Sequence, residues 1–332
     1  MCKQERRPPP SKIRHGESNM HVVRLQDWVV ILSVMGTVAA LYISAIFILL
    51  RPFIVPAEIR PKLGLMGALI LAATAFSIGC LGYAYFMEPY QLEIKYVKIA
   101  LNDIPASTKP ITIVQISDLH SDGSVRLEDK VAEEIEKIKP SLILFTGDAV
   151  NSLDGVAIFN AFAARISKVA TTLAVKGDWD FAFNPLDVLV KSKLDVVAGY
   201  RIIEINGVKF CIVGADSGAS CNESWQKAPK GLPTIMMYHN PDGDVILNNK
   251  TQGIDLYVCG HTHGGQIDLP FYGALITQSI QGKRYESGLH KLGNMWIYTN
   301  RGIGMEGHFP RIRFCSPPEL TVFELSGTGK QN

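Results

Sequence analysis

Residues 111–148, ITIVQISDLHSDGSVRLEDKVAEEIEKIKPSLILFTGD, give the clearest indication of the fold class. It begins and ends with a short apolar run, and each run leads into acidic or histidine side chains: Asp118 and His120, then Asp148. Between the runs, apolar residues recur at helical spacing over residues 127–138. A strand, a helix and a second strand in this order predict a largely parallel α/β core.

Three later apolar runs end in the same way. They read TLAVKGD (172–178), TIMMYHN (234–240) and DLYVCGHTH (255–263), and they lead to Asp178, His239, His261 and His263. Because ligands of open α/β sheets bind at the carboxyl ends of strands, we expect these seven side chains to converge. The alternative is that the acids are helix caps or turn residues and the histidines lie on the surface. The recurrence of the pattern in five runs favours a shared site.

Carboxylates and imidazoles together suit Mn²⁺, Fe²⁺ or Zn²⁺ better than Ca²⁺. Two such ions about 3.5–4 Å apart can share a hydroxide and clamp a phosphoryl group for in-line attack. The residue types therefore predict a hydrolytic site with two divalent ions, with Mn²⁺ as the preferred metal.

The pattern changes along the second half of the chain. Helical spacing recurs at 155–169 and 185–193, but after Tyr200 the sequence is rich in strands, with RIIEING, VKFCIVGAD, NMWIYTN and ELTVFEL separated by turns. This favours an α/β sandwich of two mixed β-sheets flanked by helices over a simple doubly wound sheet.

Two apolar stretches near the N-terminus are long enough to cross a membrane. Residues 28–50 and 63–86 contain no charged side chain, and about 20 apolar residues span a bilayer as a helix. The alternative is a pair of buried helices in a soluble protein. We expect a basic disordered tail at 1–27, a two-helix transmembrane hairpin within 28–86 and a globular domain at 91–327.

Charge bears on the orientation of this hairpin. The tail is rich in lysine and arginine, while the loop between the spans holds Arg51, Arg60 and Lys62. The positive-inside rule favours a multi-pass protein of the inner (cytoplasmic) membrane with its domain in the cytoplasm, although the charges of the loop leave the opposite orientation open. The net charge of +2 gives no reason to expect a nucleic acid polymer as partner.

The order D-x-H, GD, GD, H and G-H-x-H resembles the calcineurin-like metallophosphoesterase family over residues 91–325. The closing RGIG (301–304) and RIRFCSPPEL (311–320) resemble its membrane-tethered bacterial branch. The resemblance implies that one metal is held by Asp118, His120, Asp148 and His263. It implies that the other is held by Asp148, Asp178, His239 and His261, with Asp148 bridging the two.

One motif departs from the family pattern. Where the family usually has Gly-Asn-His-Asp/Glu, this chain has Gly177-Asp178-Trp179-Asp180. Asp178 can still ligate, but its charge makes the site less attractive to phosphate. Trp179 cannot act as the acid that the family histidine provides, a role worth roughly 10²–10⁴ in rate. A substrate with a good leaving group, such as a nucleotide phosphate, is therefore expected.

Three further residues are candidates for catalysis. Asp180 or His308 could take over part of the lost histidine role, and Arg301, which follows NMWIYTN, could clamp phosphate. The alternatives are a loop histidine for His308 and a surface ion pair for Arg301.

The membrane hairpin and the altered motif together indicate the substrate. The family includes membrane-associated hydrolases of UDP-2,3-diacylglucosamine in lipid A biosynthesis. We therefore expect a membrane-anchored enzyme that hydrolyses a phosphodiester or pyrophosphate of a lipid-linked substrate, with the lipid bilayer as its second partner. The alternatives are activity on cell-wall or phospholipid precursors, or a metal-binding membrane scaffold without turnover.

Overall fold

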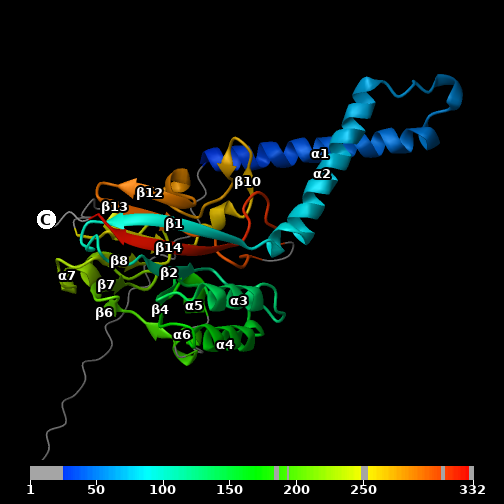
Figure 1. Ribbon diagram of the computed structural model, residues 1–332. Coiled ribbons are helices and arrows are strands. Elements are labelled where there is room, and N and C mark those ends of the chain that lie inside the picture. The colour runs from blue at the N-terminus through cyan, green and yellow to red at the C-terminus, as the bar shows by residue number, and fades with distance from the viewer. Residues whose placement is uncertain (1–24, 183–186, 193, 248–252, 308–310, 329–332) are drawn as a thin grey trace, which may run out of the picture.

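The computed structural model describes residues 25–182, 187–192, 194–247, 253–307 and 311–328 (Figure 1). The chain folds into a hairpin of two long helices followed by a sandwich of two β-sheets with helices on both outer faces. The predicted disordered tail lies almost wholly outside the described residues.

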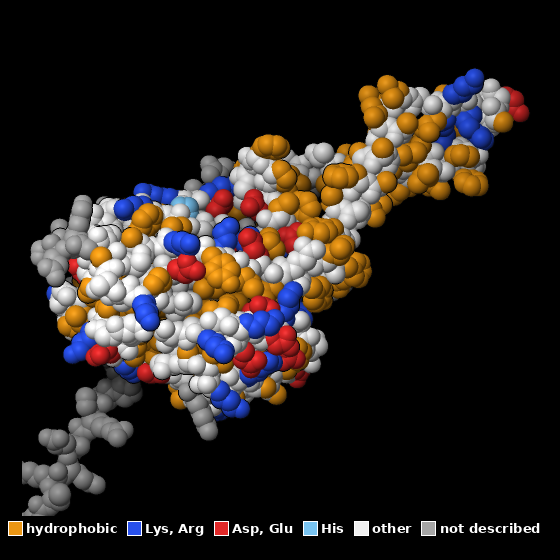
Figure 2. Space-filling model, in the orientation of Figure 1, with side chains coloured by type: hydrophobic (Ala, Val, Ile, Leu, Met, Phe, Trp, Pro, Cys, Tyr) orange, Lys and Arg blue, Asp and Glu red, His pale blue; other side chains and the backbone are white. Residues whose placement is uncertain are grey.

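Helices α1 (Leu25–Ile54) and α2 (Leu65–Phe86) form the hairpin, and it projects away from the sheets with its tip at the far end. Short 3-10 turns follow at Ala57–Ile59 and Glu88–Tyr90. Figure 2 shows hydrophobic side chains along both helices and basic side chains at the tip, where Arg60 donates to Pro52 O (2.7 Å). Both helices are long and apolar enough to cross a membrane, which indicates membrane association. That each helix spans the bilayer stays a prediction.

The first sheet has six strands in the order β1–β14–β2–β3–β4–β5. Strands β2 to β5 are parallel, while β14 is antiparallel to β2 and parallel to β1. Their bounds are Glu93–Leu101 (β1), Glu319–Gly327 (β14), Ile111–Ile116 (β2), Leu142–Phe145 (β3), Thr172–Ala174 (β4) and Asp195–Val196 (β5). The central strands are buried on both faces, which explains their unbroken apolar sequences.

The second sheet has six strands in the order β12–β13–β9–β8–β7–β6. Its central strands are parallel, and each edge strand pairs antiparallel with its neighbour. The bounds are Gly288–Leu292 (β12), Met295–Thr299 (β13), Leu256–Cys259 (β9), Thr234–Met237 (β8), Val208–Gly214 (β7) and Gly199–Ile205 (β6). A small hairpin of β10 (Asp268–Leu269) and β11 (Gly273–Ala274) stands beside α1.

Helices cover the two outer faces of the sandwich. Helices α3 (Glu128–Ile138) and α4 (Gly155–Ile166) pack on the first sheet, with the short α5 (Asp178–Ala182) and α6 (Val188–Lys191) nearby. Helices α7 (Cys221–Lys227) and α8 (Asp244–Leu247) pack on the second, and 3-10 turns lie at His263–Gly265 and Gly282–Tyr285. A further apolar cluster fills the space between the sheets.

The predicted two-sheet sandwich is confirmed. The predicted helix at 127–138 is α3, which begins one residue later because Glu128 turns back to accept the backbone N–H groups of Arg126 (2.7 Å) and Leu127 (3.1 Å). The helix predicted at 155–169 ends at Ile166, where the chain turns through bonds such as Val169 N to Ile166 O. The helix predicted at 185–193 is seen as the single turn of α6, and parts of that range lie outside the described residues.

Candidate metal centre

The carboxyl ends of five strands meet at one edge of the sandwich. Strands β2, β3 and β4 lead to the acids, and β8 and β9 of the second sheet lead to the histidines. Gln115 ties the two sheets together there, because its amide donates to Cys259 O (2.9 Å) and Thr146 Oγ1 (3.1 Å). The structure thereby brings all seven predicted metal ligands together.

The backbone at these positions has an unusual conformation. Five of the seven residues have a positive φ, between 42° and 71°: Asp118, His120, Asp148, His261 and His263. Residues other than glycine rarely adopt this region, which costs on the order of 1–3 kcal/mol each and persists where the surroundings fix it. Gly147 allows the close approach of the strand ends, since a Cβ on it would lie 2.5 Å from Gly177 N. The fold therefore stores strain at this edge.

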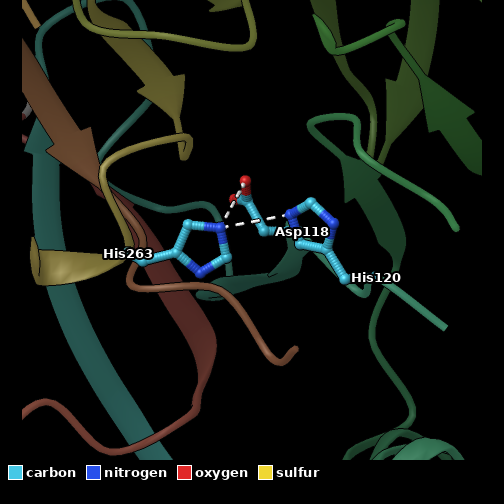
Figure 3. Close-up of side chains that lie close together, drawn as sticks. All are labelled: Asp118, His120 and His263. Carbon is cyan, nitrogen blue, oxygen red and sulfur yellow. Dashed lines mark hydrogen bonds and ion pairs between the residues drawn. The ribbon is translucent and has the colours of Figure 1, made fainter. Parts of the chain in front are cut away.

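Asp118, His120 and His263 form what we call the inner group (Figure 3). His263 Nε2 lies 3.2 Å from His120 Nε2 and 3.5 Å from Asp118 Oδ1, and all three side chains are buried. Burial lowers the pKa of both histidines well below the usual value and raises the pKa of Asp118 to about 6. Both imidazoles are therefore neutral, which is the form that binds a metal.

Asp178, His239 and His261 form the outer group. His261 Nδ1 lies 3.2 Å from His239 Nε2 and 3.3 Å from Asp178 Oδ2. The other ring nitrogens face backbone carbonyls, Thr146 O for His239 (2.8 Å) and Gln278 O for His261 (3.2 Å). Each carbonyl accepts an N–H from the nitrogen opposite it, so His239 Nε2 and His261 Nδ1 are the nitrogens that face into the group, where a metal could bind them.

Asp148 lies between the two groups. Its Oδ2 is 3.5 Å from His120 Nε2 and 3.3 Å from His239 Nε2, while its Oδ1 accepts the N–H of Trp179 (2.9 Å). Burial alone would disfavour a charged His239, but the nearby carboxylates of Asp148 and Asp118 outweigh this and raise its pKa. One oxygen atom thus faces ligands of both groups, the position that a bridging carboxylate needs.

The residues present fit two divalent metal ions. Two ligand atoms that are each about 2.0–2.2 Å from the same ion lie roughly 3 Å apart, and the inner and outer groups hold pairs at 3.2–3.5 Å. Each pair of facing nitrogens can share a proton in an N–H···N hydrogen bond, and a metal ion can take the place of that proton. The donor set suits Mn²⁺, Fe²⁺ and Zn²⁺ alike.

Comparison with known proteins identifies the family. The profile of calcineurin-like phosphoesterases matches residues 111–265. The metallophosphoesterase YkuE of Bacillus subtilis is 33% identical over 282 residues, which are 80% of this chain and 96% of YkuE. Phosphodiesterase YaeI of Escherichia coli is 31% identical over 76% of this chain and 96% of its own. The UDP-2,3-diacylglucosamine pyrophosphatase LpxG of Chlamydia trachomatis is 38% identical over 72% of this chain and 91% of LpxG.

The chain belongs to the calcineurin-like metallophosphoesterase family. It is therefore a metal-dependent phosphohydrolase, and the family uses a pair of divalent metal ions. Membership of the family supports the expected enzyme over the alternative of a scaffold without turnover.

The segment 177–180, whose motif departs from the family pattern, is called here the altered corner, and Trp179 lies in it. Its ring stands edge-on to His120, with ring centroids 5.5 Å apart, and its Nε1–H donates to Glu306 Oε1 (3.1 Å). Glu306 also accepts from the amide of Gln278 (2.7 Å). The indole therefore sits beside the inner group as a fixed apolar surface, with its one polar hydrogen already used.

Asp180 has a structural part in this corner. It is buried, and its two carboxylate oxygens accept the backbone N–H groups of Asp148 (2.9 Å), Ala149 (3.0 Å) and Gly177 (2.8 Å). These bonds join the loop after β3 to the loop after β4. The hypothesis that Asp180 replaces the family histidine is disfavoured, because both oxygens already hold the backbone.

Arg301, the predicted phosphate clamp, forms ion pairs with two carboxylates. Its guanidinium donates to Glu319 (2.7 Å) and to Glu93 (2.5 Å), and its side chain is only 15% exposed. These contacts favour the ion-pair alternative over the predicted phosphate clamp, because two carboxylates already neutralise the cation. The other catalytic candidate, His308, lies outside the described residues and stays a prediction.

Arg313 contacts the inner group, but the sequence patterns do not predict this residue as part of the site. It is fully buried, and it donates to the carbonyls of Arg301 (2.9 Å), Gly304 (3.1 Å from Nε) and Ser316 (2.8 Å). Its Nη2 lies 3.2 Å from His263 Nδ1, and its charge helps burial to keep the pKa of His263 low. An arginine within a loop carries no sequence signal for burial, so only the structure reveals it.

Proposed function

We propose that this metallophosphoesterase is anchored in a membrane by α1 and α2 and hydrolyses a phosphodiester or pyrophosphate bond of a lipid-linked substrate such as UDP-2,3-diacylglucosamine. The observation that carries the proposal is the 38% identity to LpxG, a UDP-2,3-diacylglucosamine pyrophosphatase, over 305 residues. The apolar hairpin supports it, since an enzyme held at a bilayer meets lipid-linked substrates directly.

The seven predicted ligands would hold two ions, with Mn²⁺ as the proposed metal. When bound, these ions would supply an activated water and stabilise the charge that develops on the phosphoryl oxygens. The chain itself fixes the ligands beforehand through the strained backbone and the carbonyls behind His239 and His261. Such preorganisation avoids a reorganisation cost during the reaction.

The altered corner restricts the leaving group. Neither Trp179, whose N–H is bound to Glu306, nor Asp180, whose oxygens hold the backbone, is free to donate a proton. A leaving group that needs no proton, such as a nucleoside monophosphate, would lose little from this. We therefore expect p-nitrophenyl phosphoesters to turn over much faster than alkyl ones, and equal rates would contradict this part of the proposal.

The hairpin geometry bears on sidedness. The start of α1 and the end of α2 both lie at the sandwich (Figure 1), while Arg51 lies in the last turn of α1 and Arg60 in the loop that joins the two helices. We propose that both ends and the catalytic domain lie in the cytoplasm, with two spans of the inner membrane between them. Protease protection in spheroplasts tests this: the domain should be cleaved only after lysis, and cleavage in intact spheroplasts would reverse the orientation.

The central experiment is a substrate test with the full chain in detergent and Mn²⁺. We expect UDP-2,3-diacylglucosamine to give UMP and the acylated sugar 1-phosphate, and addition of EDTA to stop the reaction. Polyprenyl diphosphate and a glycerophospholipid diester serve as the alternative substrates. Hydrolysis of one of these, with UDP-2,3-diacylglucosamine left intact, would move the function to cell-wall or phospholipid precursors.

A further inference from the structure

A cavity of about 590 Å³ lies between the helical hairpin and the domain. One wall consists of side chains from both helices, including Ile31 and Val34 of α1 and Cys80 and Leu81 of α2. The rest of the lining comes from the domain, from residues 262–278 around the metal ligand His263 and from the C-terminal loop, which contributes Glu306, Ile312 and Phe314. Ligand sites typically have volumes of roughly 300–1,000 Å³, so the space is large enough for a bound molecule.

The lining of the cavity combines two kinds of residue. It includes His263 of the inner group together with Gln278 and Glu306, which bind each other (2.7 Å). Most of the remaining lining is apolar and includes Leu269 and Leu275, while the arginine in the lining, Arg311, pairs with Asp122 at 2.7 Å. A space lined by a metal ligand and by apolar side chains matches a molecule that carries both a phosphate and a hydrocarbon chain.

The walls also discriminate between parts of the substrate. A nucleoside would bring polar ring and ribose groups against Ile31, Val34 and Leu81, where burial without hydrogen bonds costs free energy. A hydrocarbon chain loses nothing there. Along α2 the cavity extends from Ser77 to Ala84, a length of about 10 Å at ~1.5 Å of rise per residue, so several methylene groups fit end to end.

We propose that an acyl or alkyl chain of the substrate occupies this cavity while the adjoining phosphate lies at the metal centre. The inference rests on the proposed function and extends it, because it makes α1 and α2 part of the substrate site instead of a simple anchor. The opposite side of the centre, at Asp178, is open, with 48% of that side chain exposed. The nucleotide would leave on this open side.

The base of the hairpin offers an apolar path to the cavity. The β10–β11 turn is held against the start of α1 by the hydroxyl of Tyr272, which donates to Asp27 (3.0 Å). Beside it, Phe271 is fully exposed, and Ile276 and Ile280 are 37% and 50% exposed. Exposed aromatic and aliphatic side chains next to a membrane helix suit the interface of a bilayer, from which a lipid chain could enter.

The test uses the full chain in lipid nanodiscs with Mn²⁺ and two soluble probes, p-nitrophenyl methyl phosphate and p-nitrophenyl octyl phosphate. We expect kcat/KM to be at least tenfold higher for the octyl ester than for the methyl ester. Complete transfer of the longer chain from water would allow a factor of roughly four for each added methylene, so a total of tenfold requires only part of the chain to be buried. Ile31→Trp, which fills the cavity, should lower the octyl-to-methyl ratio to about one. Leu32→Trp is the matched control, because Leu32 lies next in sequence but outside the cavity and is 62% exposed.

A second pair of variants, in α2, keeps the test decisive if a variant in α1 fails to fold. Leu81→Trp should act like Ile31→Trp, while Ile78→Trp, on the exposed side of α2, should keep the octyl preference. Bound Mn²⁺ per chain checks that each variant is folded. Equal rates for both esters in the unaltered chain, or the same loss in cavity and control variants, would overturn the inference and leave the proposed function standing. If the Mn²⁺-loaded chain hydrolyses neither these esters nor bis-p-nitrophenyl phosphate, both fall.

Discussion

The inner and outer groups contain the same side chains, one aspartate and two histidines, in different surroundings. The side chains of the inner group are at most 3% exposed, whereas in the outer group Asp178 is 48% and His261 12% exposed and His239 alone is fully buried. The inner group is also backed by the buried guanidinium of Arg313. From this difference in exposure we expect the inner group, called here the buried half of the site, to retain an ion and the outer group, the open half, to admit substrate.

The departures of this chain from its family lie in the open half or at its border. Asp178 carries a charge where the family usually has a neutral asparagine, and Trp179 replaces a histidine. We expect changes of this kind to alter which phosphoester is cleaved and how fast, while the buried half keeps its metal ligands. The following predictions test this division, beginning with the residue that joins the two halves.

Replacing Asp148 should disrupt both groups at once. Its Oδ2 faces His120 and His239, so Asp148→Ala should reduce bound Mn²⁺ at both sites. Because charge stabilisation by such ions is worth several kcal/mol, turnover of bis-p-nitrophenyl phosphate should fall by roughly 10³-fold or more. Metal analysis and steady-state kinetics measure this. Asp154→Ala, an exposed acid of the following loop, is the control, and retention of full metal content by Asp148→Ala would show that the groups are independent.

Much of the buried half could be predicted from the sequence. Asp118 and His120 follow a continuous apolar run, and so does Asp148, and parallel strands place such residues at one edge. The outer ligands Asp178, His239 and His261 obey the same local rule. The sandwich itself was predictable because strand and helix patterns have different periods.

The surroundings of the site could not be predicted, because they depend on contacts between distant segments. Glu88, at the end of α2, accepts the backbone N–H of Cys315 (2.9 Å), 227 positions away, and this fixes the C-terminal loop that carries Arg313. The pairing of Arg301 with Glu93 joins residues 208 positions apart. No periodicity or motif encodes such contacts, and the cavity beside α1 and α2 follows from them.

Restoring the family residue at Trp179 should act selectively on substrates whose leaving group needs a proton. Trp179→His would supply a proton donor near the leaving group, so hydrolysis of an alkyl phosphodiester should rise by roughly 10²-fold. The p-nitrophenyl ester, which needs no proton, should change little. Trp179→Phe is the control, since it removes the bond to Glu306 without adding an acid. Equal changes for both esters in Trp179→His would mean that position 179 does not act on the leaving group.

Altering Arg313 should affect the buried half. Arg313→Lys keeps the charge but cannot reach the carbonyls of Arg301, Gly304 and Ser316 together. Residues that position metal ligands typically change affinity by about 10–100-fold, so Mn²⁺ should bind the inner group that much more weakly. Titration followed by electron paramagnetic resonance would measure it. Arg165→Lys, at a surface ion pair with Glu136, controls for the substitution, and unchanged Mn²⁺ affinity would make Arg313 a purely structural residue.

The smallest effect is expected for Asp178→Asn, which restores the neutral ligand of the family. Removing one negative charge from a half-exposed position should favour phosphate binding by about 1 kcal/mol, the strength of a contact pair in water, or roughly fivefold in KM. The amide is also a weaker ligand, so the Mn²⁺ concentration for half-maximal activity should rise. Tighter phosphate binding and weaker Mn²⁺ binding have opposite effects on activity. The effect on phosphate binding can be measured by itself only when KM is determined at saturating Mn²⁺. Asp187→Asn, whose parent carboxylate pairs with Lys176 at 3.0 Å, controls for charge alone. If Asp178→Asn instead abolished activity as Asp148→Ala does, the outer group would be as indispensable as the inner one, and its exposure would not mark a separate role.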